Sequence, residues 1–123
     1  MRQVLLDTNF IISCVRQKID FFEEIPLMGL EILIPKQVFD EIKKLSKSRE
    51  SASIREEADL ALKLLNRSKF KLIKLDYNYV DKGIIKIAGE DKDLIIATLD
   101  KELKEKIQNH KLIIRGIKTL EII

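Results

Sequence analysis

The chain has 123 residues, with 23 lysines and arginines against 20 aspartates and glutamates, which leaves a net charge of +3. This length predicts one domain, residues 1–123, and 46 % hydrophobic residues are enough for a core. The single cysteine excludes an internal disulfide, and no apolar run approaches the roughly 20 residues of a membrane span. Because the N-terminus leads straight into a strand-like run without a signal peptide, we expect a cytoplasmic protein.

The N-terminal third alternates strand-like and helix-like segments. Val4 to Leu6 is a short buried strand, and a helix is expected from about Asn9. A second short helix is expected from Asp20, its N-cap, to Glu24. Residues 31–34 form the second expected strand. Pro35 then stands at the start of a helix, because proline is tolerated in the first helical turn.

The middle of the chain holds its only polar, low-hydrophobicity stretch, residues 46–53, which predicts a mobile connector. A helix is expected over 54–66, and a half-exposed strand over 70–75, where apolar and basic residues alternate. The next helix is expected from Tyr79 to Gly89, where glycine would stop it. Residues 94–98 form the most apolar strand, which we therefore expect at the centre of the sheet.

The C-terminal part adds a charged helix over 101–108 and two short strands, 112–114 and 119–122. The alternation of strands and helices along the chain is typical of an α/β fold with a parallel sheet. No internal repeat or linker divides it.

Four acids occupy matching places in this pattern. Asp7 and Asp100 directly follow apolar strand-like runs, and Asp81 stands where a helix begins. Glu41 lies two turns into the helix after Pro35. Ligands bind at the carboxyl ends of the strands in an open α/β sheet, so we expect these acids to share one edge. Gathered carboxylates repel one another unless a cation neutralises them, and hard oxygen ligands suit Mg²⁺ or Mn²⁺. The pattern predicts metal-assisted phosphodiester hydrolysis with one or two ions.

Three of the four acids have a structural alternative, because Asp7, Asp81 and Asp100 all stand where they can cap a helix. The only histidine, His110, lies in a polar turn and is expected at the surface rather than as a general base. A phosphoacceptor receiver domain is disfavoured because no middle strand ends in aspartate. A haloacid-dehalogenase-like phosphatase is disfavoured because Asn9 replaces the second carboxylate of its Asp-x-Asp motif.

Four motifs in order resemble those of PIN-domain nucleases. They are Leu5-Leu6-Asp7-Thr8-Asn9, Ile34-Pro35-x-x-Val38-x-x-Glu41-Ile42, Asp81, and Thr98-Leu99-Asp100-Lys101-Glu102-Leu103. The resemblance covers nearly the whole chain and implies a three-layer α/β/α fold with a central parallel sheet. It also implies a Mg²⁺- or Mn²⁺-dependent endoribonuclease. The metal would be held, directly or through water, by Asp7, Glu41, Asp81 and Asp100. Asn9 and Thr98 would support these acids by hydrogen bonds.

Within that family, the spacing of the third and fourth acids resembles small archaeal proteins related to ribosomal RNA-processing nucleases, and VapC-type toxins are the other nearby branch. The implied substrate is RNA. The implied partners are a second copy of the chain, an antitoxin-like protein or a ribosome-associated protein. Basic candidates for RNA contact stand near the ends of the motifs: Lys36, Lys43, Lys47, Arg49 and Lys82.

Two residues depart from the family pattern. Lys82 follows Asp81, where many relatives carry a second acid, and Glu102 stands where some carry aspartate. A cation beside Asp81 would weaken metal binding or pair with that carboxylate. The sequence therefore leaves a second function open, a PIN-like scaffold that binds RNA or a protein without cleaving.

Overall fold

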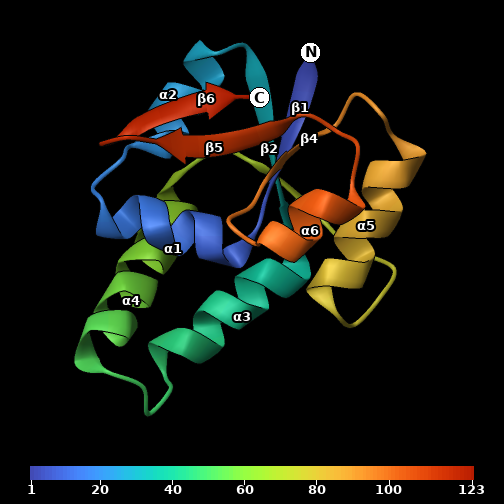
Figure 1. Cartoon of the computed structure of the whole chain (residues 1–123). Coiled ribbons are helices and arrows are strands. Elements are labelled where there is room, and N and C mark those ends of the chain that lie inside the picture. The colour runs from blue at the N-terminus through green and yellow to red at the C-terminus, as the bar shows by residue number, and fades with distance from the viewer.

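The computed structural model describes all residues, 1–123, and arranges six strands in one sheet (Figure 1). The strand order is β3-β2-β1-β4-β5-β6. The strands are β1 (Arg2–Leu6), β2 (Leu30–Pro35), β3 (Lys71–Ile73), β4 (Ile95–Ala97), β5 (Lys111–Arg115) and β6 (Thr119–Ile122). Strands β1 to β5 are parallel, as the alternation of strands and helices predicts. Only β6 is antiparallel, because residues 116–118 are too few for a crossover connection and return the chain as a hairpin.

Six helices cover the two faces of this sheet (Figure 1). They are α1 (Thr8–Arg16), α2 (Phe21–Leu27), α3 (Lys36–Ser46), α4 (Ala52–Arg67), α5 (Val80–Glu90) and α6 (Lys101–Lys106). Helices α1, α3 and α4 pack on one another, and α5 packs on α6. With right-handed crossovers, α1 to α4 lie on one face and α5 and α6 on the other. The three-layer arrangement expected from the sequence is therefore confirmed.

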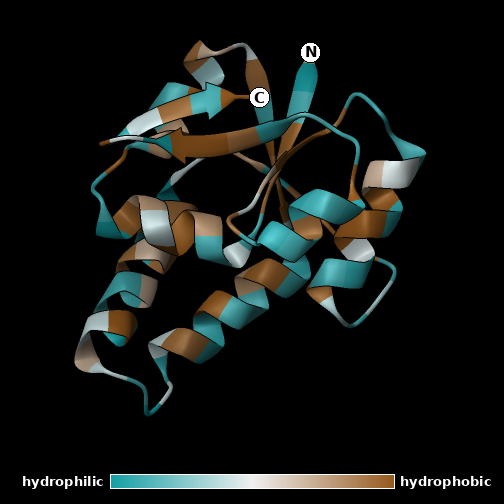
Figure 2. Ribbon diagram, viewed as in Figure 1, coloured by the Kyte–Doolittle hydropathy of each residue, from teal (hydrophilic) through white to brown (hydrophobic).

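The core lies on both sides of the central strands. Val4, Leu5 and Leu6 of β1 are fully buried, and so are Ile95 and Ile96 of β4. Figure 2 shows these central strands as hydrophobic, while the outward faces of the helices are largely hydrophilic. Burying a side chain of this size stabilises the fold by about 1.5–3 kcal/mol. The expected central place of β4 is confirmed, since it pairs with β1 on one side and β5 on the other. None of the helices has both the length and the apolar character needed to cross a membrane.

Two expected element ends are wrong. Gly89 does not stop α5, which continues through Glu90 and has Asp91 as its C-cap, because the backbone at Gly89 does not take the left-handed conformation. The third strand, β3, ends at Ile73 rather than Leu75. Its neighbour β2 ends at Pro35, the register partner of Ile73, so no strand remains for the chain beyond that point to pair with.

The polar connector is also shorter than expected. Helix α3 continues through Ser46, and α4 begins at Ala52 with Ser51 as its N-cap. The Ser51 hydroxyl accepts a hydrogen bond from Ile54 N at 3.3 Å, which is why the helix starts two residues earlier than its apolar periodicity indicates. The last helix, α6, ends at Lys106 rather than Gln108.

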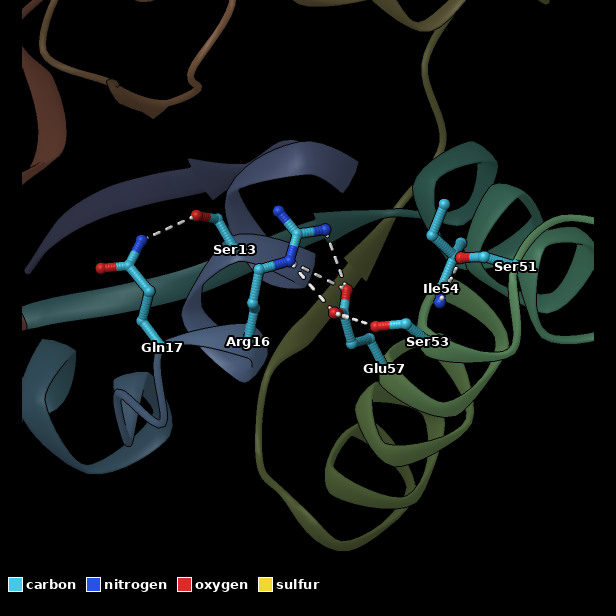
Figure 3. Close-up of polar contacts among 7 residues, drawn as sticks. All are labelled: Ser13, Arg16, Gln17, Ser51, Ser53, Ile54 and Glu57. Carbon is cyan, nitrogen blue, oxygen red and sulfur yellow. Dashed lines mark hydrogen bonds and ion pairs between the residues drawn. The ribbon is translucent and has the colours of Figure 1, made fainter.

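An ion pair joins α1 to α4 (Figure 3). The Arg16 guanidinium donates from Nε to both carboxylate oxygens of Glu57 at 3.1 Å and from Nη2 to Oε2 at 2.9 Å. The Ser53 hydroxyl donates to Glu57 Oε1 at 3.3 Å. These hydrogen bonds from Arg16, with its charge, lower the pKa of Glu57 below its ordinary value of 4.5.

We expect Glu57→Gln to lower the free energy of unfolding by less than about 1 kcal/mol at pH 7, because the pair lies at the surface. The pKa of Glu57 is lowered in the folded state, so its contribution is present above pH 4.5 and disappears as the pH falls through the folded value. Urea unfolding at pH 7 and pH 3 measures this difference. Glu56→Gln, at an exposed neighbour without a partner, is the matched control.

Candidate active site

The strand order reverses between β1 and β4. The strand that follows β1 in sequence, β2, lies on one side of this pair, and the strand that follows β4, β5, lies on the other side. Ligands of open α/β sheets bind in the crevice at the carboxyl ends of such strands. Asp7 directly follows β1, and Thr98 and Asp100 follow β4 at this place. The strand order thus brings together residues 91 or more positions apart in the sequence.

Asp7 is the most buried of the four acids at this crevice. Its side chain is buried, and both carboxylate oxygens accept hydrogen bonds, Oδ1 from Thr8 N at 2.8 Å and Oδ2 from the Thr98 hydroxyl at 2.9 Å. The Thr98 hydroxyl also accepts from Asp100 N at 3.2 Å. Thr98 therefore ties the end of β1 to the end of β4 and has the hydrogen bond expected of it. Its role in activity stays a prediction.

The charges of the four acids act on one another. Burial raises the pKa of Asp7 above 3.8, and the charges of Asp81 and Asp100 raise it further, against the hydrogen bonds from Thr98 and Thr8. Partial desolvation raises the pKa of Glu41, although the residue as a whole is exposed, and the charges of Asp7 and Asp81 raise it further. Carboxylates that repel one another this way form a local negative potential, which a cation would relieve.

Thr8 has the only buried side-chain polar atom that lacks a hydrogen-bond partner, its hydroxyl Oγ1. This hydroxyl lies close enough to Glu41 to lower the pKa of that carboxyl slightly, yet it makes no hydrogen bond of normal geometry. An unpaired buried hydroxyl costs about 1–3 kcal/mol and calls for a ligand or ordered water. Thr8 was not among the site residues predicted from the sequence. The only feature of the sequence that points to it is its place between Asp7 and Asn9, two residues that were predicted.

The capping alternative applies to only some of the acids. Asp100 Oδ1 accepts from Glu102 N at 2.9 Å and from Leu103 N at 3.3 Å, so it caps α6, while its Oδ2 accepts no hydrogen bond. Asp7 is the N-cap of α1. Asp81 caps nothing, because the N-cap of α5 is Tyr79. The Asp81 carboxylate accepts no hydrogen bond, and the Glu41 carboxylate has only the contact with the Thr8 hydroxyl described above.

The remaining predicted site residues lie at the surface. Asn9 is exposed and makes no hydrogen bond with the acids, but it lines a hollow with Asp100 and Arg16. The five basic candidates are all exposed and form no ion pair: Lys36, Lys43, Lys47, Arg49 and Lys82. In particular, Lys82 does not pair with Asp81. The cation that lowers the pKa of Glu41 is Lys44, which sequence reasoning missed. His110 is exposed, as expected.

The donor set fits a hard divalent cation in its chemistry. As the side chains stand, no three of the Asp, Glu, His and Cys groups converge closely enough to hold a metal ion. Mg²⁺, however, keeps several waters and is usually bound through one or two carboxylates. The mutual repulsion at Asp7 and Glu41 and the unpaired Thr8 hydroxyl are consistent with a hydrated cation at this crevice.

A mostly parallel sheet with acids at its switch point is the architecture of the PIN class of α/β domains. The family described as "PIN like domain" matches residues 4–118, and the chain belongs to this family. It is similar to Ribonuclease VapC4 of Methanocaldococcus jannaschii, with 34 % identity over 99 % of this chain and 97 % of the relative. The rRNA-processing protein fcf1 of Schizosaccharomyces pombe is 32 % identical over 97 % of this chain, which spans only 58 % of that protein.

Solved structures agree with this family. The PIN domain endonuclease Utp24 superposes with a TM-score of 0.75 and 28 % identity, covering 98 % of this chain and 90 % of that one. A domain of a protein from Methanocaldococcus jannaschii has a TM-score of 0.60 at 18 % identity, over 97 % and 95 % of the two chains, and shows likeness of fold alone.

Proposed function

We propose that this chain is a metal-dependent endoribonuclease of the cytoplasm, acting as one domain over residues 1–123. The observation that carries this proposal is the buried carboxylate of Asp7, oriented on both oxygens and lying within the electrostatic reach of Glu41, Asp81 and Asp100. Its family includes proteins named as a ribonuclease and as an endonuclease. Helix capping alone does not explain four acids at one crevice, because Asp81 is not the N-cap of α5 and Glu41 lies in the interior of α3.

The proposed metal ligands are Asp7, Glu41, Asp81 and Asp100, binding Mg²⁺ or Mn²⁺ directly or through water. When bound, such a cation supplies an activated water and stabilises negative charge on the phosphoryl group. The residues of this chain orient that centre. Thr98 and Thr8 fix the rotamer of Asp7, the backbone N–H groups of α6 fix Asp100, and the Thr8 hydroxyl is available to hold a water.

The likenesses support two biological settings, a toxin-type ribonuclease and an enzyme of ribosomal RNA processing. The match to Ribonuclease VapC4 spans almost the full length of both chains, which supports an antitoxin-like partner. The likeness to the rRNA-processing protein fcf1 supports a ribosome-associated one. A homodimer is a third proposed assembly. Purification of the tagged chain from its own cells separates these settings by what comes with it, a small DNA-binding protein or ribosomal particles.

The experiment that tests the activity is cleavage of mixed structured and unstructured RNAs by the purified chain with Mn²⁺, with EDTA, and with Asp7→Asn. We expect cleavage only with metal and with Asp7 present. Asp93→Asn is the matched control, because Asp93 is exposed and its carboxylate accepts no hydrogen bond. Cleavage that persists in EDTA or in Asp7→Asn would contradict the proposal. RNA binding without any cleavage would favour the scaffold, and Lys82 would then be the first residue to change.

Thr98→Val is expected to lower the rate of cleavage about 10- to 100-fold, because residues that orient metal ligands have effects of this size. The change removes the hydroxyl that joins Asp7 to Asp100 while keeping the side-chain volume. Thr98→Ser keeps the hydroxyl and is expected to retain most of the rate. Metal titration of both variants locates the effect, since a positioning role predicts weaker Mn²⁺ binding for valine and not for serine.

A further inference from the structure

The loop between β3 and α5 carries both tyrosines of the chain, Tyr77 and Tyr79. Their side chains are 46 % and 72 % exposed. Tyr79 is the N-cap of α5 and stands two residues before Asp81, so the loop ends at one of the four acids. An exposed aromatic side chain alone needs no explanation. Two of them on the loop that leads directly to Asp81 place exposed aromatic faces next to one acid of the candidate active site.

Basic side chains accompany these rings. Lys82 Nζ lies 5.7 Å from the centre of the Tyr79 ring, a distance at which a cation is attracted to the ring face. An open hollow is lined by Tyr77, Lys82, Ile85 and Lys86. Lys86 pairs with Asp76 and Glu90, whereas Lys82 has no acidic partner. Two unpaired charges therefore stand beside the rings: the Lys82 ammonium, which is free to contact an RNA phosphate, and the Asp81 carboxylate of the proposed metal site.

Helix α3 holds the loop between β3 and α5 in place by hydrogen bonds from one side chain. Gln37 of α3 donates from Nε2 to the carbonyl oxygens of Leu75 at 2.9 Å and Tyr77 at 3.3 Å. Its Oε1 accepts from Leu75 N at 3.1 Å. Gln37 lies four residues, about one helical turn, before Glu41, so α3 carries both an acid of the site and the side chain that holds the tyrosine loop.

Helix α5 closes on the same loop. A Cβ at Gly83 would lie 2.7 Å from Leu75 Cβ, closer than side chains pack, so only glycine lets α5 approach this far. Leu75 is buried, whereas residues 76–79 are all exposed. The fold thus fixes a segment whose large side chains face solvent. Fixing it gains little for the core, but it presets the positions of the two rings relative to Asp81.

We propose that Tyr77 and Tyr79 form a stacking platform for unpaired bases of single-stranded RNA next to the scissile phosphate, with Lys82 contacting the backbone and Gln37 positioning the loop. Aromatic faces beside a free lysine are the elements with which proteins bind single strands. A duplex keeps its bases stacked on each other and leaves none for the rings. The proposal rests on the proposed function and names the residues that would hold the RNA beside the site.

The test measures binding in EDTA, where no cleavage is expected, using one RNA oligonucleotide that contains 2-aminopurine, as a single strand and as a duplex. We expect the single strand to bind more tightly than the duplex and its fluorescence to be quenched. Replacing both tyrosines by leucine is expected to weaken single-strand binding by about 30-fold or more, the combined effect of two stacked bases, and to remove the quenching. Replacing both by phenylalanine should preserve binding and quenching, because the rings remain.

Leu72→Ala, at an exposed apolar residue of β3, is the matched control and should change neither readout. Gln37→Leu should weaken binding with a smaller loss of quenching, because the rings remain but their loop is released. Thermal unfolding of every variant separates misfolding from loss of stacking. Lys82→Ala should lower the salt dependence of binding, and Lys92→Ala, at an exposed lysine elsewhere, should not.

The platform is overturned if the leucine variant binds and quenches like the unchanged chain, or if the unchanged chain prefers the duplex or binds neither RNA. The outcome is separate from that of the cleavage experiment. Tyrosine-dependent quenching without any cleavage would keep the platform and remove the nuclease. Cleavage that needs Asp7, together with normal RNA binding by the leucine variant, would keep the nuclease and remove the platform.

Discussion

Metal-free Asp7→Asn protein is expected to unfold at a higher temperature than the unchanged chain at pH 7. Asp7 is only 6 % exposed, and burial together with the charges of Asp81 and Asp100 raises its pKa. Its ionised form is therefore held against an unfavourable environment, and asparagine can keep hydrogen bonds to Thr8 and Thr98 without the charge. Relieving this unfavourable charge is expected to stabilise the folded state by about 1.4 kcal/mol for each unit by which the pKa of Asp7 is raised.

The pH dependence of this gain has a definite sign. Because the pKa of Asp7 is raised in the folded state, protonated Asp7 favours folding, and this contribution is complete below its ordinary value of 3.8. It is lost as the pH rises through the folded pKa. The advantage of Asp7→Asn should therefore be small below pH 3.8 and grow toward neutral pH. Thermal unfolding of both proteins in EDTA across this range measures it, and Asp93→Asn serves again as the control.

Adding Mn²⁺ should reverse the order of stability. A ligand that binds only the folded state stabilises it by about 2.7 kcal/mol at 100 times its dissociation constant. The unchanged chain should gain this stability and Asp7→Asn should not. Equal stabilisation of both proteins by Mn²⁺ would contradict a metal site at Asp7. An asparagine variant that is less stable than the unchanged chain in EDTA would contradict the unfavourable charge inferred for Asp7.

The part of the fold that follows from local pattern was accessible to sequence reasoning. Leu5 and Leu6 before Asp7, and the apolar run before Thr98, mark buried parallel strands, because a strand covered on both faces reads as continuously apolar. An acid directly after such a strand must lie at its carboxyl end. Asp7 and Asp100 were therefore placed at one edge correctly, although the sequence left open which of them also caps a helix.

The features that sequence reasoning missed depend on contacts between distant segments. The end of β3 depends on where β2 stops, and Gln37 bonds a loop 38 residues away. The unpaired hydroxyl of Thr8 depends on what packs around it, which no local pattern reports. Gly89 stands near a helix end but not at it, since a glycine signals a stop only where the backbone turns left-handed.

Asp100→Asn is expected to abolish metal-dependent cleavage while leaving stability almost unchanged. Asparagine is as good an N-cap as aspartate, and its side-chain oxygen can accept the hydrogen bonds from Glu102 N and Leu103 N. What it lacks is the negative charge and the free Oδ2. Asp100→Ala removes the cap as well, so it is expected to lose activity and also about 1 kcal/mol of stability.

This pair of substitutions separates the two roles of Asp100. If capping were its whole function, asparagine would behave like the unchanged chain and alanine would lose stability in proportion to any loss of activity. Asp81→Asn provides the contrast, because Asp81 is not an N-cap: the change should abolish cleavage and cost at most about 1 kcal/mol of stability, from the loss of a negative charge in the first turn of α5. Urea unfolding and RNA cleavage, measured on the same preparations, decide between these outcomes. If the carboxylates of Asp81 and Asp100 are needed in cleavage for their charge, then asparagine at either position must abolish cleavage.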